Sequence, residues 1–152
     1  MGAKEYLESY AALKMEVRMN EDRIAEVFYE AQIPATHLSD GSRRTPGGRG
    51  HQEKANIRYI ETKDRLQPMI DANKAKMREI EATIDGIRNP ILRELLRIRY
   101  TDTDTWKPLK WRDVAMRMYG DDDENALQRL TRFHREALAA FEAVLTEAGI
   151  QK

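Results

Sequence analysis

Apolar residues recur at alternating spacings of four and three in two long stretches of this chain. The first stretch, about residues 3–33, places its apolar positions and one polar position in a single row: Tyr6, Tyr10, Leu13, Val17, Asn20, Ile24 and Val27. The second, about residues 52–88, repeats the row: Leu66, Ile70, Asn73, Met77, Ile80, Ile84 and Ile87. A sustained repeat of this kind with charged residues between is typical of a coiled-coil seam.

The two rows match when they are laid antiparallel, since Leu13 then meets Ile80 and Val27 meets Leu66. We therefore expect a helical hairpin of about 45 Å over residues 1–88. In this register Asn20 falls opposite Asn73, as expected of a hydrogen-bonded pair that fixes the register. The alternative is that each asparagine occupies a frayed or exposed position. Pro68 lies on the outer face and favours a mild kink, or else a separate helix over residues 52–66.

The two rows are separated by residues 34–51, which are rich in Gly, Pro and Ser and predict a mobile loop. Arg43, Arg44 and Arg49 make this loop basic, so it is either an arm that contacts nucleic-acid phosphates or a solvated loop with incidental arginines. Its GGRG run is not a phosphate-binding loop, because no Gly-Lys-Ser/Thr follows it.

A second region, residues 89–152, begins with Asn89-Pro90, a strong helix-start signal. We expect a helix to about Tyr100 and a loop to Lys110, in which Trp106 covers the edge of a small core. Two further helices are expected to follow, from Trp111 and from about Asp123.

The break between these last two helices is at Tyr119-Gly120, and the acids that follow offer N-cap oxygens for the second helix. In that helix, which we expect Gly149 to end, apolar residues occupy one face. The opposite face is polar: Asn125, Gln128, Arg129, Arg132 and Arg135. A buried first helix, a Gly turn and a polar second helix are typical of a helix-turn-helix.

Composition restricts the functions that the chain can have. Charged residues make up 34% of it, with Lys+Arg and Asp+Glu equal at 26 each, and it has no cysteine. These features favour an all-α cytoplasmic protein without disulfide or thiol chemistry, and no apolar run approaches a membrane span. Because a small domain that binds DNA alone is usually strongly basic, DNA binding here requires a local patch, a dimer or a larger partner.

Catalytic and metal-binding patterns are missing from the sequence. His37, His51 and His134 lack metal-ligand spacing, and the acidic run from Asp121 to Glu124 lacks the alternating oxygens of a calcium loop. We therefore expect neither an enzyme nor a cofactor nor a metal.

The segments Leu96–Tyr100, Trp111–Ala115 and His134–Leu138 resemble region 4 of sigma-70 factors. That family typically shows an Arg-Tyr that closes one helix, an aromatic residue before an acidic-Ile/Val-Ala trio, a Gly turn and a closing basic-x-Ala-Leu. With a charged helical hairpin in front, the layout is similar to phage and prophage regulators of late-operon transcription, the ArpU and RinA type and their uncharacterised relatives.

This resemblance implies that residues 123–135 form a recognition helix. Its candidate base contacts are Asn125, Gln128, Arg129 and Arg132. Its candidate phosphate contacts are Arg112, Arg117 and Arg135, together with the loop residues Arg43, Arg44 and Arg49.

The expected function is that of a transcriptional regulator which binds double-stranded DNA, with RNA polymerase or a second copy at the hairpin as further partners. Two alternatives remain. A small terminase-like packaging protein would join the same module to oligomerising helices. A helical scaffold without nucleic-acid binding is favoured by the neutral charge and by the acids at the helix tip.

Overall fold

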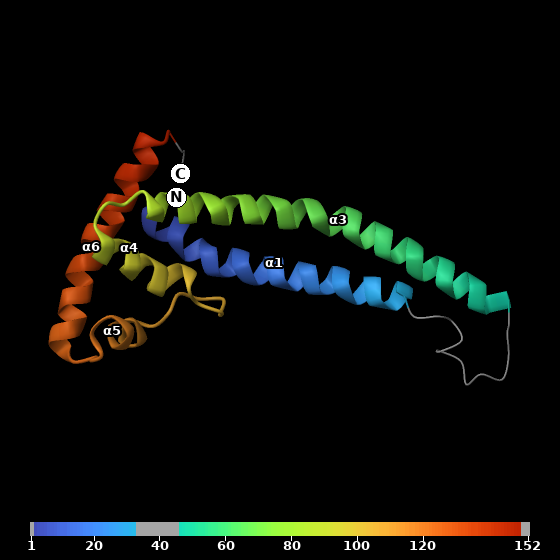
Figure 1. Ribbon diagram of the computed structural model, residues 1–152, viewed down its shortest axis with the longest axis horizontal. Helices are drawn as coiled ribbons and strands as arrows, with labels where there is room; N and C mark the ends of the chain where they lie inside the picture. The colour runs from blue at the N-terminus through green and yellow to red at the C-terminus, as the bar shows by residue number, and fades with distance from the viewer. Residues whose placement is uncertain (1, 33–45, 150–152) are drawn as a thin grey trace. The chain divides into compact units, whose positions relative to one another are not determined.

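We analysed a computed structural model that describes residues 2–32 and 46–149, with side chains from residue 50 onward in the second range. In these ranges every regular element is helical, which confirms the expected all-α class (Figure 1). The elements are α1 (Ala3–Gln32), α3 (Pro46–Asp85), α4 (Pro90–Leu96), the π-helix η1 (Arg97–Thr101), α5 (Trp111–Tyr119) and α6 (Glu124–Glu147). None of the described helices is long and apolar enough to cross a membrane.

The chain divides into two compact units, and α1 and α3 contribute to both. The larger unit comprises residues 1–15 and 74–152, and the smaller comprises residues 16–73. This division differs from the expected one, which placed residues 1–88 in one domain and 89–152 in the other. The reason is the core of the larger unit, because it joins the start of α1 and the end of α3 to the C-terminal helices.

The core of the larger unit is built around side chains that solvent does not reach, including Leu7 of α1, Tyr100 of η1 and Phe141 of α6. The rings of Tyr6 and Phe141 lie 6.1 Å apart, so α1 is in direct contact with α6. The other buried members come from every helix of the unit: Ala3, Tyr10, Ile80, Ile84, Ile87, Leu92, Leu95, Leu96, Ile98, Val114, Ala115, Ala126, Leu130, Ala137 and Leu145.

The passage from α3 to α4 follows the expected capping pattern. Asn89 accepts a hydrogen bond of 2.9 Å from the Ile91 amide through its side chain, and Pro90 occupies the first helical position. Arg93 donates from Nη1 to the carbonyls of Ile87 (2.7 Å) and Arg88 (3.1 Å), which lie beyond the end of α3. These bonds satisfy backbone groups that a helix end and a turn leave without partners.

Gly86 ends α3 at a point where a helix passes close by. A Cβ atom on Gly86 would lie 2.9 Å from Val144 Cγ1 of α6, closer than carbon atoms pack. A larger residue at position 86 would therefore require the Val144 side chain to shift.

The π-helix decides which side chain enters the core after α4. In an uninterrupted α-helix, residue 99 would follow Leu92 two turns later on the same face. The Asp102 amide instead donates to the Arg97 carbonyl at 2.8 Å, a five-residue spacing that adds one residue to the turn. Tyr100 thereby takes the buried position, and Arg99 is left at the rim.

The segment between η1 and α5 is held by Lys14, whose Nζ donates to the carbonyls of Thr101 (3.4 Å) and Thr103 (3.1 Å). Thr101 at the end of η1 and Thr103 in this segment are buried, whereas Trp106 is 51% exposed. The prediction that Trp106 covers the edge of the core was therefore wrong, since Trp106 is not among the side chains packed against it.

In the smaller unit, α1 and α3 run antiparallel. Phe28 and Tyr59 have ring centroids 5.2 Å apart, and Glu30 pairs with Arg58 at 3.5 Å. The Ala31 carbonyl accepts a hydrogen bond from the Gln52 side chain. Pro68 lies within the unbroken α3, so a separate helix over residues 52–66 does not form.

The buried contact of this unit follows part of the predicted rows, with Val17, Val27, Leu66 and Ile70 at 8% exposure or less. Asn20 and Asn73 lie in the same rows. The side-chain nitrogen Nδ2 of each is buried and has no hydrogen-bond partner among the described residues. The hydrogen bond predicted between the two asparagines is therefore absent, because one of these nitrogens would have to be its donor. Their role in fixing the register stays a prediction.

The connection between α1 and α3 is shorter than expected. The predicted mobile loop covered residues 34–51, but α3 already begins at Pro46, and residues 46–51 are therefore helical. Proline suits the first turn of a helix because its missing N–H is not needed there. Residues 33–45 lie outside the described part.

Candidate nucleic-acid interface

The candidate interface is formed by α5, a turn and α6. Gly120 ends α5 in the left-handed conformation (φ 71°), and its amide donates to the Met116 carbonyl. A non-glycine residue would be strained there. Asp123 then begins α6, and its side chain accepts a 2.8 Å hydrogen bond from the Ala126 amide. The predicted break and the predicted N-cap are thus both present.

The acidic turn serves the local structure in part. Asp121 Oδ1 accepts a 3.0 Å hydrogen bond from the Asp123 amide, and Asp123 caps α6. Asp122 and Glu124 are exposed, and Glu124 lies in the first turn of α6, where negative charge is favourable. The turn therefore has a structural reason for most of its acids, although their charge remains at the tip of the helix.

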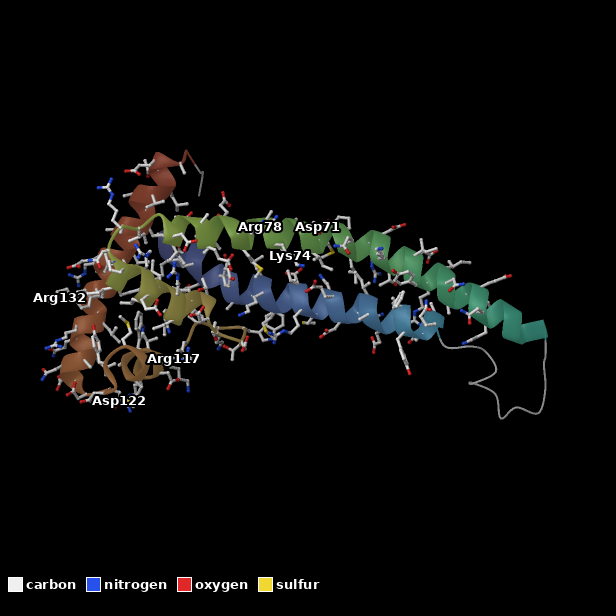
Figure 2. All side chains as sticks on the ribbon, in the orientation of Figure 1. Asp71, Lys74, Arg78, Arg117, Asp122 and Arg132 are labelled. Carbon is white, nitrogen blue, oxygen red and sulfur yellow. The ribbon has the colours of Figure 1, made fainter. Side chains whose placement is uncertain are left out.

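The four candidate base contacts form one surface on α6. Asn125, Gln128, Arg129 and Arg132 are exposed and together line an open depression of about 260 Å³. Figure 2 shows Arg132 extending from α6, with Asp122 in the turn and Arg117 on α5. Among the described residues, neither Arg129 nor Arg132 has an acidic partner. We call this set the polar face of α6.

The opposite side of α6 is packed, because Ala126, Leu130, Ala137 and Phe141 are buried. Both α4 and α5 contact α6. The polar face is therefore carried by a helix whose other side is fixed in the core, as a recognition surface requires.

The candidate phosphate contacts fall into three groups according to where they lie in the structure. Arg112 and Arg117 of α5 and Arg135 of α6 are exposed, and in the described part of the chain none of them forms an ion pair. Arg43 and Arg44 lie outside the described residues. Arg49 lies in the first turns of α3, where side chains are not described. The structure thus brings the α6 and α5 candidates into one unit and leaves the basic arm untested.

Behind the polar face, four side chains from three elements are in contact. Tyr100 Oη lies 2.6 Å from His134 Nε2 of α6, and the Trp111 ring of α5 meets the His134 ring edge-on at 4.6 Å. The Arg99 guanidinium carbon lies 4.3 Å from the centre of the Trp111 ring. We call Arg99, Tyr100, Trp111 and His134 the ring cluster.

Burial gives His134 an unusual protonation behaviour. Loss of solvation, together with the positive charges of Arg99 and Lys4, lowers the pKa of His134 to about 4. The imidazole is therefore neutral near pH 7, and one of its ring nitrogens can accept a hydrogen bond. Burial also raises the pKa of Tyr100, which remains a neutral hydroxyl.

The sequence did not predict the ring cluster. In the sequence, Arg99 lies near the end of the helix expected to reach Tyr100, and His134 lacks metal-ligand spacing. Aromatic residues and a histidine near the helix ends were the one signal in the sequence for such a cluster. Whether these side chains meet in space, however, depends on the π-helix. An insertion of one residue in a helical turn cannot be read from apolar periodicity.

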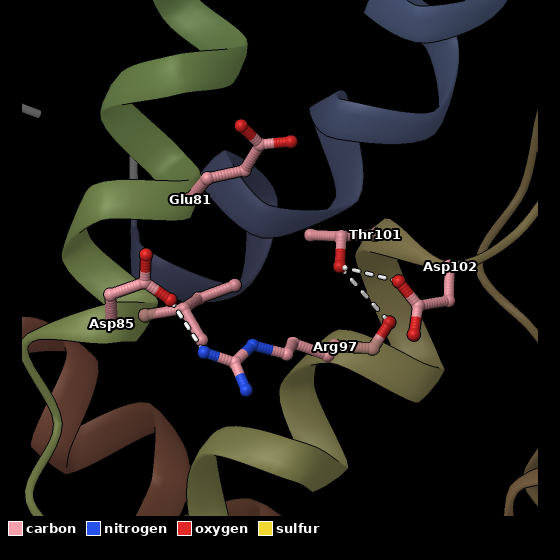
Figure 3. A pocket seen from close by; sticks show the side chains of 6 residues that line it. Glu81, Asp85, Arg97, Thr101 and Asp102 are labelled. Carbon is pink, nitrogen blue, oxygen red and sulfur yellow. Dashed lines mark hydrogen bonds and ion pairs between the residues drawn. The ribbon is translucent and has the colours of Figure 1, made fainter.

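A second depression of about 260 Å³ lies between α3 and η1 and is lined mostly by polar side chains (Figure 3). Asp85 accepts from Arg97 Nη2 at 2.5 Å, and Thr101 Oγ1 donates to the Arg97 carbonyl at 3.2 Å. Glu81, which also lines it, accepts from the Tyr10 hydroxyl. These bonds stabilise the junction of the helices and leave no obvious group to bind a ligand.

Within the described ranges, no group of three or more His, Asp or Glu side chains is arranged to hold a metal ion. His51 is exposed on α3, and His37 lies outside the described part. The acidic run of the turn gives no metal site either.

Comparison of the chain with protein-family models, with curated proteins and with solved structures finds no significant match. The likeness to sigma-70 region 4 and to phage regulators therefore stays a prediction from the quoted segments.

Proposed function

We propose that this protein is a non-enzymatic, sequence-specific DNA-binding regulator of the phage or prophage type. In this proposal α5, the turn and α6 act as a helix-turn-helix, and α6 enters the major groove. The observation that carries the proposal is the polar face of α6, since four side chains suited to base recognition are exposed together on a helix with a packed back.

The chemistry of these side chains supports base recognition. Asn125 and Gln128 can each pair with an adenine through two hydrogen bonds, and Arg129 and Arg132 can each pair with a guanine. Because neither arginine is held by a carboxylate in the described structure, each can turn toward a base without breaking an ion pair. Arg112, Arg117 and Arg135 would contact phosphates and set the position of the protein on the duplex.

The acids of the turn weaken this binding without excluding it. Asp121 and Asp123 are committed to backbone hydrogen bonds that form the turn and cap α6. Asp122 has no such bond among the described residues, and its charge would repel a nearby phosphate. We therefore expect one copy of the protein to bind DNA with modest affinity, and a partner to increase that affinity.

The smaller unit is proposed to supply that partner contact through a helical hairpin of α1 and α3. It exposes large apolar side chains, which is the usual property of a protein contact surface: Met19, Phe28, Tyr29, Ile57, Ile60 and Met69. A second protomer or RNA polymerase would bind there, and a dimer would double the number of phosphate contacts.

The test begins with selection of bound genomic fragments at moderate salt by the full-length protein. Arg129→Ala and Arg132→Ala should each weaken binding to the selected site by about 1–3 kcal/mol if they read bases. Arg23→Ala is the matched control, because Arg23 is an exposed arginine of α1 in the smaller unit. The affinity of this variant for the selected DNA site should equal that of the wild type.

The outcomes separate the rival functions. Equal affinities of the Arg129 and Arg132 variants and the wild type would place the reading surface elsewhere. A large discrete assembly in light scattering would favour a packaging protein. Absence of DNA binding even at low salt, together with a stable protein partner, would favour a helical scaffold and overturn the proposal.

A further inference from the structure

We propose that Arg99 is a positioning residue which holds α6 against α5 through Trp111 and His134, and that base discrimination by α6 depends on it. The inference rests on the proposed function for its consequence, but not for its geometry. Arg99 belongs to η1 and is not part of the polar face of α6.

Arg99 fixes the start of α5 by two backbone contacts at one residue. Its carbonyl accepts a 2.8 Å hydrogen bond from the Leu109 amide, and its Nη1 donates to the Leu109 carbonyl. Leu109 directly precedes Lys110, the N-cap of α5. The side chain and the backbone of one arginine therefore close the segment from η1 to α5.

The guanidinium then extends this hold to the first residue of α5. It lies over the Trp111 ring at 4.3 Å, a distance at which a planar cation is attracted to the face of an indole. The Trp111 and His134 rings form a T-shaped contact, so the position of the indole fixes one side of the imidazole.

His134 connects this chain of contacts to the polar face. It lies on α6 between Arg132 and Arg135, and its ring turns inward to the Tyr100 hydroxyl. Tyr100 follows Arg99 in η1 and is fully buried. His134 is therefore held from two sides, by Tyr100 of η1 and by Trp111 of α5, which Arg99 of η1 contacts in turn.

The consequence for recognition is geometric. A base-reading side chain must be placed to within about 0.5 Å to form its paired hydrogen bonds. Phosphate contacts tolerate displacement better because they depend mainly on charge. Loss of the Arg99 contacts should therefore reduce discrimination between base pairs more than it reduces the electrostatic part of binding.

Two substitutions separate the planar contact from the charge. Arg99→Met keeps an apolar stem of similar reach and loses both the guanidinium and its charge. Arg99→Lys keeps the charge and loses the planar group that lies over Trp111. Arg112→Met is the matched control, because Arg112 is an exposed arginine of α5 that we assign to phosphate.

The first measurement compares affinity for the selected site with affinity for the same site carrying one substituted base pair. For the wild type this ratio should be roughly 5- to 150-fold. Arg99→Met and Arg99→Lys should lower it several-fold and leave the salt dependence unchanged. Arg112→Met should keep the ratio and reduce the slope of log K against log salt by about 0.9. The same behaviour from Arg99→Met would make Arg99 a phosphate contact and overturn the inference.

The second measurement needs no DNA. In a Trp106→Phe background the emission reports Trp111 alone, since the chain has two tryptophans. Protonation of the adjacent imidazole should quench it, with a midpoint near the His134 pKa of about 4 in the parent protein. Arg99→Met should raise this midpoint, because a positive charge beside the ring is lost, while burial continues to hold it below the ordinary value.

The two measurements distinguish a failure of the proposed function from a failure of the role of Arg99. If the parent protein binds no DNA, the proposed function and the role of Arg99 in discrimination both fail. If the midpoint and emission of Arg99→Met equal those of the parent, Arg99 does not hold the ring cluster. A shifted midpoint combined with an unchanged discrimination ratio would reduce Arg99 to a structural contact and overturn the inference.

Discussion

Tyr100 Oη and His134 Nε2 lie 2.6 Å apart and join η1 to α6 directly behind the polar face. The bond requires a neutral imidazole if the hydroxyl is its donor, because a protonated ring has no acceptor nitrogen. Burial of the ring also disfavours its charged form, so protonation of His134 and its packing against η1 are opposed.

We predict that the unfolding free energy falls as the pH is lowered from about 6.5 to about 4. The folded-state pKa of His134 is lowered to about 4, whereas an unfolded chain takes up the proton near 6.5. Between these values only the unfolded state binds the proton, so stability is lost with falling pH and levels off below the folded pKa. The loss attributable to His134 is about 2 kcal/mol once solvent screening of the partly exposed ring is allowed for.

The control for this prediction is His134→Gln, which offers Tyr100 an amide oxygen and does not titrate. Urea unfolding of both proteins between pH 4 and 7 gives the contribution of His134 as the difference between their pH profiles. Carboxylates titrate in both proteins and cancel. Parallel profiles would show that His134 is protonated equally in the folded and unfolded states.

Two neighbouring acids of the turn should respond differently to substitution. Asp123→Ala removes the N-cap of α6 and should cost about 0.5–2 kcal/mol of stability, measured by urea unfolding. Asp122→Asn removes an exposed charge and should leave stability unchanged within about 0.5 kcal/mol. On the proposed function, Asp122→Asn should also tighten DNA binding by about threefold at low salt, and less at high salt. Weaker binding by this variant would mean that Asp122 contacts the ligand favourably.

Local signals predicted much of this fold from the sequence. Asn89, Gly120 and Asp123 each satisfy a backbone requirement at a helix end, and such requirements depend only on neighbouring residues. The polar face of α6 was likewise visible, because exposure of one helix face follows from periodicity.

The parts that were missed depend on contacts between distant segments. A single row of apolar residues describes a helix with one neighbour, but Leu7 lies outside the predicted row of α1 and is fully buried. The start of α1 is enclosed by the C-terminal helices as well as by α3, so its buried face is wider than a seam. For the same reason the unit boundary falls within α1 and α3, and not at residue 88.

Leu7→Ala should therefore destabilise the C-terminal helices as well as α1, by about 2–5 kcal/mol. The Trp111 signal and the helical signal should move to lower urea together, since both depend on one core. Met19→Ala on the same helix is the control, because Met19 is 57% exposed and its removal should change stability by less than about 0.5 kcal/mol. A separate, unshifted transition for Trp111 would show that residues 89–152 fold independently of α1.

The last prediction concerns Asn20 and Asn73, whose buried Nδ2 atoms donate to no group in the described structure. Each unmade hydrogen bond costs about 1–3 kcal/mol, so replacing both residues by leucine should raise the unfolding free energy. If the two amides lie at the same level, as the sequence predicts, the single replacements should not add up to the double one. Each single replacement leaves the remaining asparagine amide facing an apolar side chain. The coupling energy between the two replacements should therefore exceed about 0.5 kcal/mol.

A double-mutant cycle of Asn20→Leu and Asn73→Leu, followed by urea unfolding, measures this coupling. The control cycle pairs Asn20→Leu with Gln67→Leu, since Gln67 of α3 bonds Asp71 on its own helix. Additive effects in both cycles would place the asparagines at different levels and remove the register pair. Coupling in the first cycle alone would mean that two amides at one level select the alignment of α1 and α3, and do so at the expense of stability.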